Sequence, residues 1–338
     1  MNIVKANAKL MEHNNHPYAF IEKVGRTCYK SEDKITDESA VAFVKSLVKK
    51  RHGAMLEHEI IYLRDSRFGV NSSVSERTPN FIQLFWQMLS VADTIYDVKV
   101  GDHKSLRNYV KVDYFHGIAG ASFRTWIQII EEFKDRYPSL IIIISRALHG
   151  EYPEIFEELA PTTIDPESPL VVMPRSEVEE IVRESEEPSD LLFHTVLFTC
   201  DRGVSHEFVR HRPASFGQES TRYCNYTRGQ FGSEITVIEP CFWSDHDSVQ
   251  YRTWKNACEL AESNYFELIN SGATAQEARS VLPNSLKTEI FITASEVEWQ
   301  HIVNLRYHGT TGAPHPQMKE VMTIAYPLLV EASNGRIK

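Results

Sequence analysis

The sequence contains no run of about 18 uncharged apolar residues, which is the length that a membrane-spanning helix requires. Its most apolar stretch, around residues 140–145, is far shorter than that. The first residues also lack the apolar middle part of a secretion signal. We therefore expect a soluble, cytoplasmic protein that has no membrane partner.

Cysteine is scarce as well. The chain has five cysteines, which are scattered and never form a C-x-x-C pair. An odd number without metal-ligand spacing fits neither a disulfide scaffold nor a zinc ribbon. No cysteine chemistry is expected to support the structure.

Positive charge is in the minority, with 36 Lys and Arg against 46 Asp and Glu and a net charge of -10. A protein that coats duplex nucleic acid neutralises many phosphates, so this balance argues against a nucleic-acid partner. A local basic cluster can still bind a single anion. The 338 residues, 42% of them hydrophobic, are sufficient for a substantial core.

Local patterns predict a series of elements. The segment Thr36-Asp37-Glu38 precedes an apolar series, which predicts a capped helix ending near Arg51 and Gly53. Alternation from Leu56 to Tyr62 predicts a half-buried strand. Further strands are predicted at 191–199, 234–239 and 287–294, and further helices after Asp201, at about 248–270, after Thr274, after Ser295 and from Pro316 to about Glu331.

The densest polar run extends from Arg210 to Tyr223 and contains three arginines, one histidine and two serines. It is predicted to begin at the end of a helix and to continue as a loop. Arginine suits phosphates and planar carbonyl edges because its rigid fork forms paired, charge-assisted hydrogen bonds. A solvated basic turn would have the same arginines. Neutral donors and acceptors at Ser215, Gln218 and Ser220 favour a site that reads a nucleotide.

Arg210-His211-Arg212, followed by seven residues and Ser220, resembles the signature of the flavin-dependent thymidylate synthases. Four further blocks resemble that family in the same order. They are His52 to His58, with its Glu-His pair; Glu277 to Pro283, with Thr288 and Thr293; His301 to Arg306, ending in Leu-Arg; and Gly312 to Gln317.

This resemblance implies a binding site for each of two ligands. The residues implied for dUMP are Glu207, Arg210, Gln218, Ser220, Arg222, Arg279 and Arg306. Those implied for FAD are His52, Ala54, Glu57, Arg210, His211, Arg212, Gln218, Ser295, Val297 and His301. The two implied catalytic residues are Arg306 and Ser220.

The implied activity is a methyltransferase reaction that converts dUMP to dTMP. Methylenetetrahydrofolate donates the carbon, and FADH2, regenerated by NADPH, donates a hydride. The resemblance also implies a homotetramer whose active sites lie at subunit interfaces. The alternative is a non-catalytic nucleotide-binding or regulatory protein that kept the dUMP loop but lost the flavin chemistry.

Arg306 is assigned electrostatic activation of the uracil ring, because a guanidinium does not give up its proton at neutral pH. Ser220 is interpreted as a hydrogen-bonding partner of the substrate, since no neighbouring pattern supplies the base that a serine nucleophile requires. A metal site at His52, Glu57 and His58 is disfavoured, because i and i+6 do not share a helical face. No metal is expected.

The chain departs from the family pattern at Ala54-Met55, Gly217, Ser295 and Val297. These changes bear on the flavin contacts more than on the dUMP site. About 150 residues also separate Glu57 from Arg210, where a compact family member needs only a short connection.

We therefore predict one α/β (α+β) domain over residues 1–338, with a central sheet flanked by helices. A mainly helical insertion is expected at approximately 65–190. Within it, Arg124 and Trp126 either face the site or only pack.

Overall fold

The computed structural model describes the whole chain except residues 14–15, 67–80, 97–105, 158–168, 223–225 and 227–233. By its internal contacts the chain divides into two compact units. The first unit comprises residues 1–12, 23–35 and 194–338, and the second comprises 13–22 and 36–193. Both mix helices with sheets, so the expected mixed fold class is confirmed at this coarse level.

A four-stranded sheet of order β2-β7-β10-β8 forms the centre of the first unit. Its strands are β2 (Asn7–Met11), β7 (Phe193–Asp201), β10 (Lys287–Ser295) and β8 (Ser215–Gln218). β2 is antiparallel to β7, and β8 is antiparallel to β10. A separate two-stranded sheet pairs β1 (Asn2–Val4) in parallel with β9 (Thr236–Ile238).

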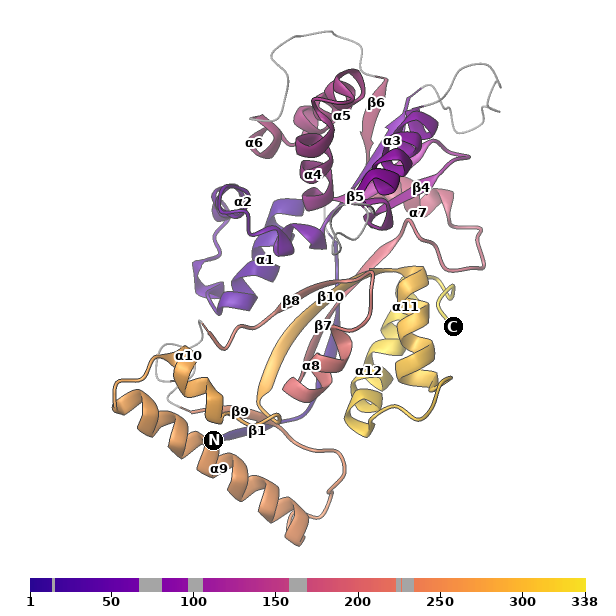
Figure 1. Ribbon diagram of the computed structural model, residues 1–338. Helices are drawn as coiled ribbons and strands as arrows, with labels where there is room; N and C mark the ends of the chain where they lie inside the picture. Colours follow the sequence, from indigo (N-terminus) through magenta and orange to yellow (C-terminus); the bar gives the residue numbers. More distant parts are fainter. Residues whose placement is uncertain (14–15, 67–80, 97–105, 158–168, 223–225, 227–233) are drawn as a thin grey trace. The chain divides into compact units, whose positions relative to one another are not determined.

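Helices α11 and α12 pack with β7 and β10 around one apolar core (Figure 1). Phe198, Ile292, Trp299 and Met322 are fully buried in this core. The helices of the first unit are α8 (Arg202–Phe208), α9 (Val249–Asn270), α10 (Ala275–Ala278), η6 (Arg279–Val281), α11 (Glu296–Val303), η7 (Asn304–His308) and α12 (Pro316–Ala332). Two more elements are α1 (Pro17–Tyr29), which crosses the sequence boundary between the units, and η1 (Glu32–Lys34).

Side-chain caps fix several of these helix starts where the sequence predicts them. Asp201 accepts a hydrogen bond from the backbone of Val204, and Ser295 accepts one from that of Glu298. Thr274 and Glu277 form a reciprocal capping box. Each cap satisfies backbone N–H groups that the first turn of a helix leaves without a partner.

The second unit has its own four-stranded sheet, of order β4-β5-β3-β6. Its strands are β4 (Val110–Asp113), β5 (Ile118–Ser122), β3 (Ile60–Asp65) and β6 (Leu170–Met173), and each neighbouring pair is antiparallel. Its helices are α2 (Ser39–Lys49), η2 (Gly53–His58), α3 (Phe81–Tyr96), η3 (Leu106–Tyr109), α4 (Phe123–Phe133), α5 (Pro138–Glu151), α6 (Pro153–Phe156) and α7 (Arg175–Ile181). Among the described residues, no helix is both long and apolar enough to span a bilayer.

Three local predictions need correction. The chain from Gly53 to His58 is a 3-10 helix, so the strand begins only at Ile60. The polar run after Arg210 does not stay a loop, because Ser215–Gln218 pairs with β10 as β8. The helix at Ser39 begins without a side-chain cap, so Thr36 and Asp37 do not cap it.

The segment predicted as an insertion at 65–190 contains β4, β5 and β6 in addition to helices. These strands were not anticipated from the sequence. They pair with β3, which lies before the predicted insertion, so the second unit extends beyond the predicted bounds. The prediction of one domain carrying an inserted region stays a proposal, and parts of that region lie outside the described residues.

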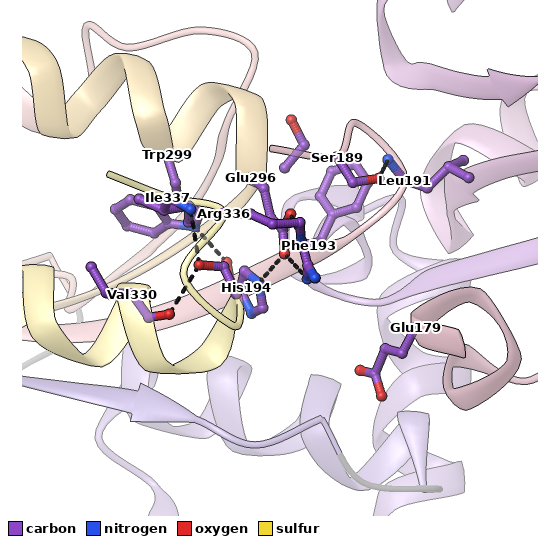
Figure 2. A network of polar contacts seen from close by, with 12 residues as sticks. Glu179, Ser189, Leu191, Phe193, His194, Glu296, Trp299, Val330, Arg336 and Ile337 are labelled. Atoms are coloured by element: carbon purple, nitrogen blue, oxygen red, sulfur yellow. Dashed lines mark hydrogen bonds and ion pairs between the residues drawn. The ribbon is translucent and has the colours of Figure 1, made fainter. Parts of the chain in front are cut away.

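The C-terminal residues of the first unit are held by a buried ion pair (Figure 2). Glu296, the first residue of α11, is fully buried and accepts two hydrogen bonds from Arg336, at 2.9 and 2.8 Å. His194 Nε2 lies 3.0 Å from the same carboxylate. This network fixes the start of α11 between the sheet and the end of the chain.

We predict that Arg336→Ala lowers the free energy of unfolding by about 3–5 kcal/mol, because it leaves Glu296 buried without its cation. Urea denaturation of both proteins measures the difference. Lys255→Ala, which removes an exposed Lys255–Glu259 pair, is the matched control and should change the value by less than about 1 kcal/mol. Equal effects of the two substitutions would contradict this account of the network.

Candidate active site

The polar run at Arg210 is positioned by elements on either side of it. β7 ends at Asp201, whose side chain caps α8, and α8 ends at Phe208, two residues before Arg210. After the turn, β8 returns along β10 with Gln218 opposite Ile290. The run is therefore anchored by a capped helix at its start and by the sheet at its end.

Arg306 contacts both Glu207 and His211. It lies in η7, a π-helical turn that continues α11. Its Nη1 donates to Glu207 Oε2 at 2.7 Å, and its Nε donates to His211 Nε2 at 3.0 Å. The Arg306 side chain is 22% exposed. Two acceptors fix the plane of the guanidinium, while its other N–H groups stay available to a ligand.

His211 is held in its neutral form. Burial, followed by the nearby charges of Arg306 and His301, lowers the pKa of His211 to about 4. Because Nε2 accepts the hydrogen bond from Arg306, the proton of the neutral ring resides on Nδ1. At neutral pH, His211 therefore orients Arg306 without adding a positive charge.

Gln218 and Ser220 are fixed by different partners. Gln218 Nε2 donates to Ser205 Oγ at 2.8 Å and to Thr288 Oγ1 at 3.3 Å. The backbone N–H of Ser220 donates to the carbonyl of Cys28 at 3.0 Å, and its hydroxyl accepts from the backbone N–H of Arg222 at 3.3 Å. In the part of the chain that the structure describes, no hydrogen bond between this hydroxyl and a histidine or carboxylate is seen.

The structure brings together some of the predicted dUMP residues. Glu207 and Arg306 share the cluster with His211. Arg279 donates to Thr221 at 3.4 Å, next to the end of the polar run. Arg210 and Arg222 are both exposed. Tyr223 lies outside those residues.

The predicted flavin residues fall in both units of the chain. In the first unit, Arg212 and His301 are exposed, and Val297 is 43% exposed. In the second unit, His52 and Ala54 are exposed, and Glu57 pairs with Arg124.

Ser295 differs from the other predicted flavin residues. Its side chain is buried, and its hydroxyl accepts the backbone N–H of Glu298 as the cap of α11. This hydroxyl is therefore engaged in holding the helix.

Sequence reasoning missed a group of supporting residues. Glu219 is 3% exposed and lies 3.6 Å from Lys30 Nζ and 3.4 Å from Lys287 Nζ, and Lys30 also pairs with Glu289. These charges hold the chain beside Ser220. Thr288 lies in one of the blocks that resemble the family, but the sequence predicted no function for it. No sequence signal joins Lys30 to Glu219, since 189 residues separate them.

His211, Glu298 and His301 present potential metal ligand atoms within 4.8 Å of one another. Two features oppose a cation there. Arg306 already occupies the Nε2 lone pair of His211, and its guanidinium adds a positive charge. We therefore retain the prediction of a site without metal.

Comparison with protein-family models finds a match over part of this chain. The model for the family described as "Thymidylate synthase complementing protein" matches residues 176–331. This match covers less than half of the 338 residues.

Its curated relatives are called flavin-dependent thymidylate synthases. The relative from Pyrococcus furiosus is 36% identical over 107 residues, which cover 32% of this chain and 43% of the relative. The relative from Aquifex aeolicus is 22% identical over 304 residues, which cover 85% of this chain and 87% of the relative. The chain thus spans less than half of the Pyrococcus relative and most of the Aquifex one.

A solved structure of a UMP/dUMP methylase, PolB from Streptomyces cacaoi bound with 5-Br dUMP, aligns with 98% of this chain and 93% of that protein. The identity is 13% and the TM-score is 0.38. A likeness at this level does not establish a shared fold.

We predict that the His211 ring titrates near pH 4 and is the neutral Nδ1–H tautomer at about pH 6. Arg306→Gln should raise the pKa of His211 by removing a positive neighbour. NMR of isotope-labelled histidine measures both quantities. An unshifted midpoint in Arg306→Gln would show that Arg306 does not act on the ring.

The same shift has a consequence for stability. An unfolded histidine titrates near about 6.5, so below that pH the unfolded chain takes up a proton that folded His211 does not. The contribution of His211 to stability is complete above about pH 6.5 and is lost as the pH falls toward about 4.

Proposed function

We propose that this chain is a flavin-dependent thymidylate synthase, which converts dUMP to dTMP with methylenetetrahydrofolate as the carbon donor. The observation that carries the proposal is the placement of Arg306 against Glu207 and His211, within residues that match the family. Substrates, NADPH as reductant and a homotetrameric assembly are part of this proposal. The family name of the relatives supports the flavin.

The residues present fit an anionic dinucleotide cofactor. Arg210 and Arg212 offer exposed guanidinium groups, His301 an exposed ring, and Val297 an exposed apolar surface beside the start of α11. Ser295 caps α11 through its hydroxyl oxygen and so supports the start of that helix. When bound, FAD supplies the hydride that reduces the transferred carbon to a methyl group.

In the proposed mechanism, Arg306 acts on the uracil ring by charge. Carbon C5 of uracil becomes a nucleophile only as negative charge develops over the ring and its carbonyl oxygens. A guanidinium whose plane is already fixed stabilises that charge without reorganising during the reaction. Glu207 and His211 position Arg306. Because His211 is neutral, it does so without changing the charge at the guanidinium.

The other proposed dUMP residues bind and orient. Gln218 presents its amide beside Ser205 and Thr288, which fix its direction. Ser220 offers its hydroxyl, and the backbone of Ser220 is held by its hydrogen bond to the Cys28 carbonyl. Arg210, Arg222 and Arg279 are assigned to the nucleotide phosphate and the pyrimidine edges.

We expect Arg306→Ala to reduce dTMP formation severely, measured as tritium release from C5-labelled dUMP, because it removes the preorganised charge. Losing a single such donor costs on the order of 100-fold to 1000-fold in rate. Arg252→Ala, at an exposed arginine of α9, is the matched control and should keep full turnover. Undiminished turnover in a folded Arg306→Ala protein would remove Arg306 from the mechanism.

Ser220→Ala should lower turnover in the same assay without erasing it, because the hydroxyl binds substrate and does not attack it. The kinetic measurement is paired with mass spectrometry of the protein during turnover. A covalent adduct on Ser220 would overturn this assignment.

Omitting each component in turn separates the two functional hypotheses. An enzyme of the proposed kind forms dTMP only when FAD, NADPH and methylenetetrahydrofolate are all present, and the purified protein with flavin absorbs near about 450 nm. A non-catalytic nucleotide-binding protein binds dUMP but forms no dTMP under any combination.

A further inference from the structure

Arg124 is held close to the predicted flavin residues of the second unit. It is the second residue of α4, whose start is capped by Ser122. The first turn of α4 is bound to the chain at β3, because the N–H of Phe123 donates to the Glu59 carbonyl at 3.3 Å and Trp126 Nε1 donates to the Ile61 carbonyl at 3.0 Å. Trp126 is fully buried, so it packs, and it thereby fixes the place of Arg124.

The Arg124 side chain lies directly against η2. A Cβ atom added to Gly53 would stand 2.8 Å from Arg124 Cδ, so a larger residue there would displace the Arg124 side chain from this position. Nη1 of Arg124 pairs with Glu57 Oε1. The Arg124 side chain is 41% exposed and that of Glu57 is 22% exposed. Glu57 thus holds Nη1 of a guanidinium that is partly open to solvent.

The segment from α2 to η2 is basic although the whole chain is acidic. Residues 39–58 contain four lysines and arginines, and Glu57 is their one acid. Lys49, Lys50 and Arg51 are exposed at the end of α2, where cations complement the helix dipole. The helix dipole alone accounts for cations at this position, so these three residues do not by themselves indicate a ligand. Arg124 comes from another helix, and a partly exposed pair with Glu57 contributes little to stability.

We propose that Arg124 is a further cofactor-binding residue, which donates to the diphosphate of the flavin dinucleotide. This inference rests on the proposed function. A guanidinium held by one carboxylate presents parallel N–H groups that match two phosphate oxygens. The basic end of α2 adds positive potential just before η2, and the absence of a side chain at Gly53 lets Arg124 lie against that turn.

The proposal is tested by titrating the protein with FAD and, separately, with riboflavin, which lacks the diphosphate. Arg124→Ala should weaken FAD binding by about tenfold or more and leave riboflavin binding nearly unchanged. Arg124→Lys should recover part of the loss, because it keeps the charge but not the paired donors. Arg183→Ala, at an exposed Arg–Glu pair of the same unit, is the matched control and should bind FAD like the wild type.

A double-mutant cycle with Glu57→Gln separates direct binding from an effect through Glu57. A direct contact predicts that Arg124→Ala still selectively weakens FAD when Glu57 is already Gln. If the double variant binds FAD as well as Glu57→Gln alone, Arg124 acts only through Glu57 and the proposal is wrong.

Two further outcomes would overturn the proposal. Equal losses for FAD and riboflavin in Arg124→Ala would mean that the substitution damages the site in general. Unchanged FAD binding in Arg124→Ala would remove Arg124 from the site while leaving the proposed function intact. Failure of the wild-type protein to bind any flavin would instead reject the proposed function, and this inference with it.

Discussion

The pairing of β8 with β10 is the constraint on which the candidate site of the first unit depends. β10 lies between β7 and β8, and its register sets Gln218 opposite Ile290. At one end of β10, Thr288 meets Gln218. At the other end, Ser295 starts α11, which leads to Arg306 and back to Glu207 and His211. The single strand β10 thus fixes the positions of both the polar run and Arg306, which contacts that run.

Each of the two units uses the same electrostatic device at its predicted ligand residues. Arg306 is held by Glu207 in the first unit, and Arg124 is held by Glu57 in the second. An arginine that pairs with a carboxylate uses one or two of its N–H groups in that pair, and the pair restricts the orientation of the guanidinium plane. The remaining donors then point in a defined direction. In a chain of net charge -10, these two held arginines provide positive potential at the places where a ligand is proposed.

Local signals predicted much of the first unit, because caps and strand composition act over a few residues. Asp201, Thr274 and Ser295 start helices as expected, and β7 and β10 have the apolar and β-branched residues of buried strands. β5 was missed because all of its residues are buried, so no alternation marks it. The contact between Arg306 and Glu207 joins residues 99 positions apart, which only the folded chain could reveal.

The central claim is that a pyrimidine nucleotide is bound where Arg306 meets Glu207 and His211. A crystal structure of the assembled protein with dUMP and FAD tests it most directly. The account predicts the guanidinium of Arg306 within hydrogen-bond distance of a uracil oxygen, with the plane of Arg306 still held by Glu207 and His211. Nucleotide bound elsewhere, with Arg306 making no contact to it, would contradict the account.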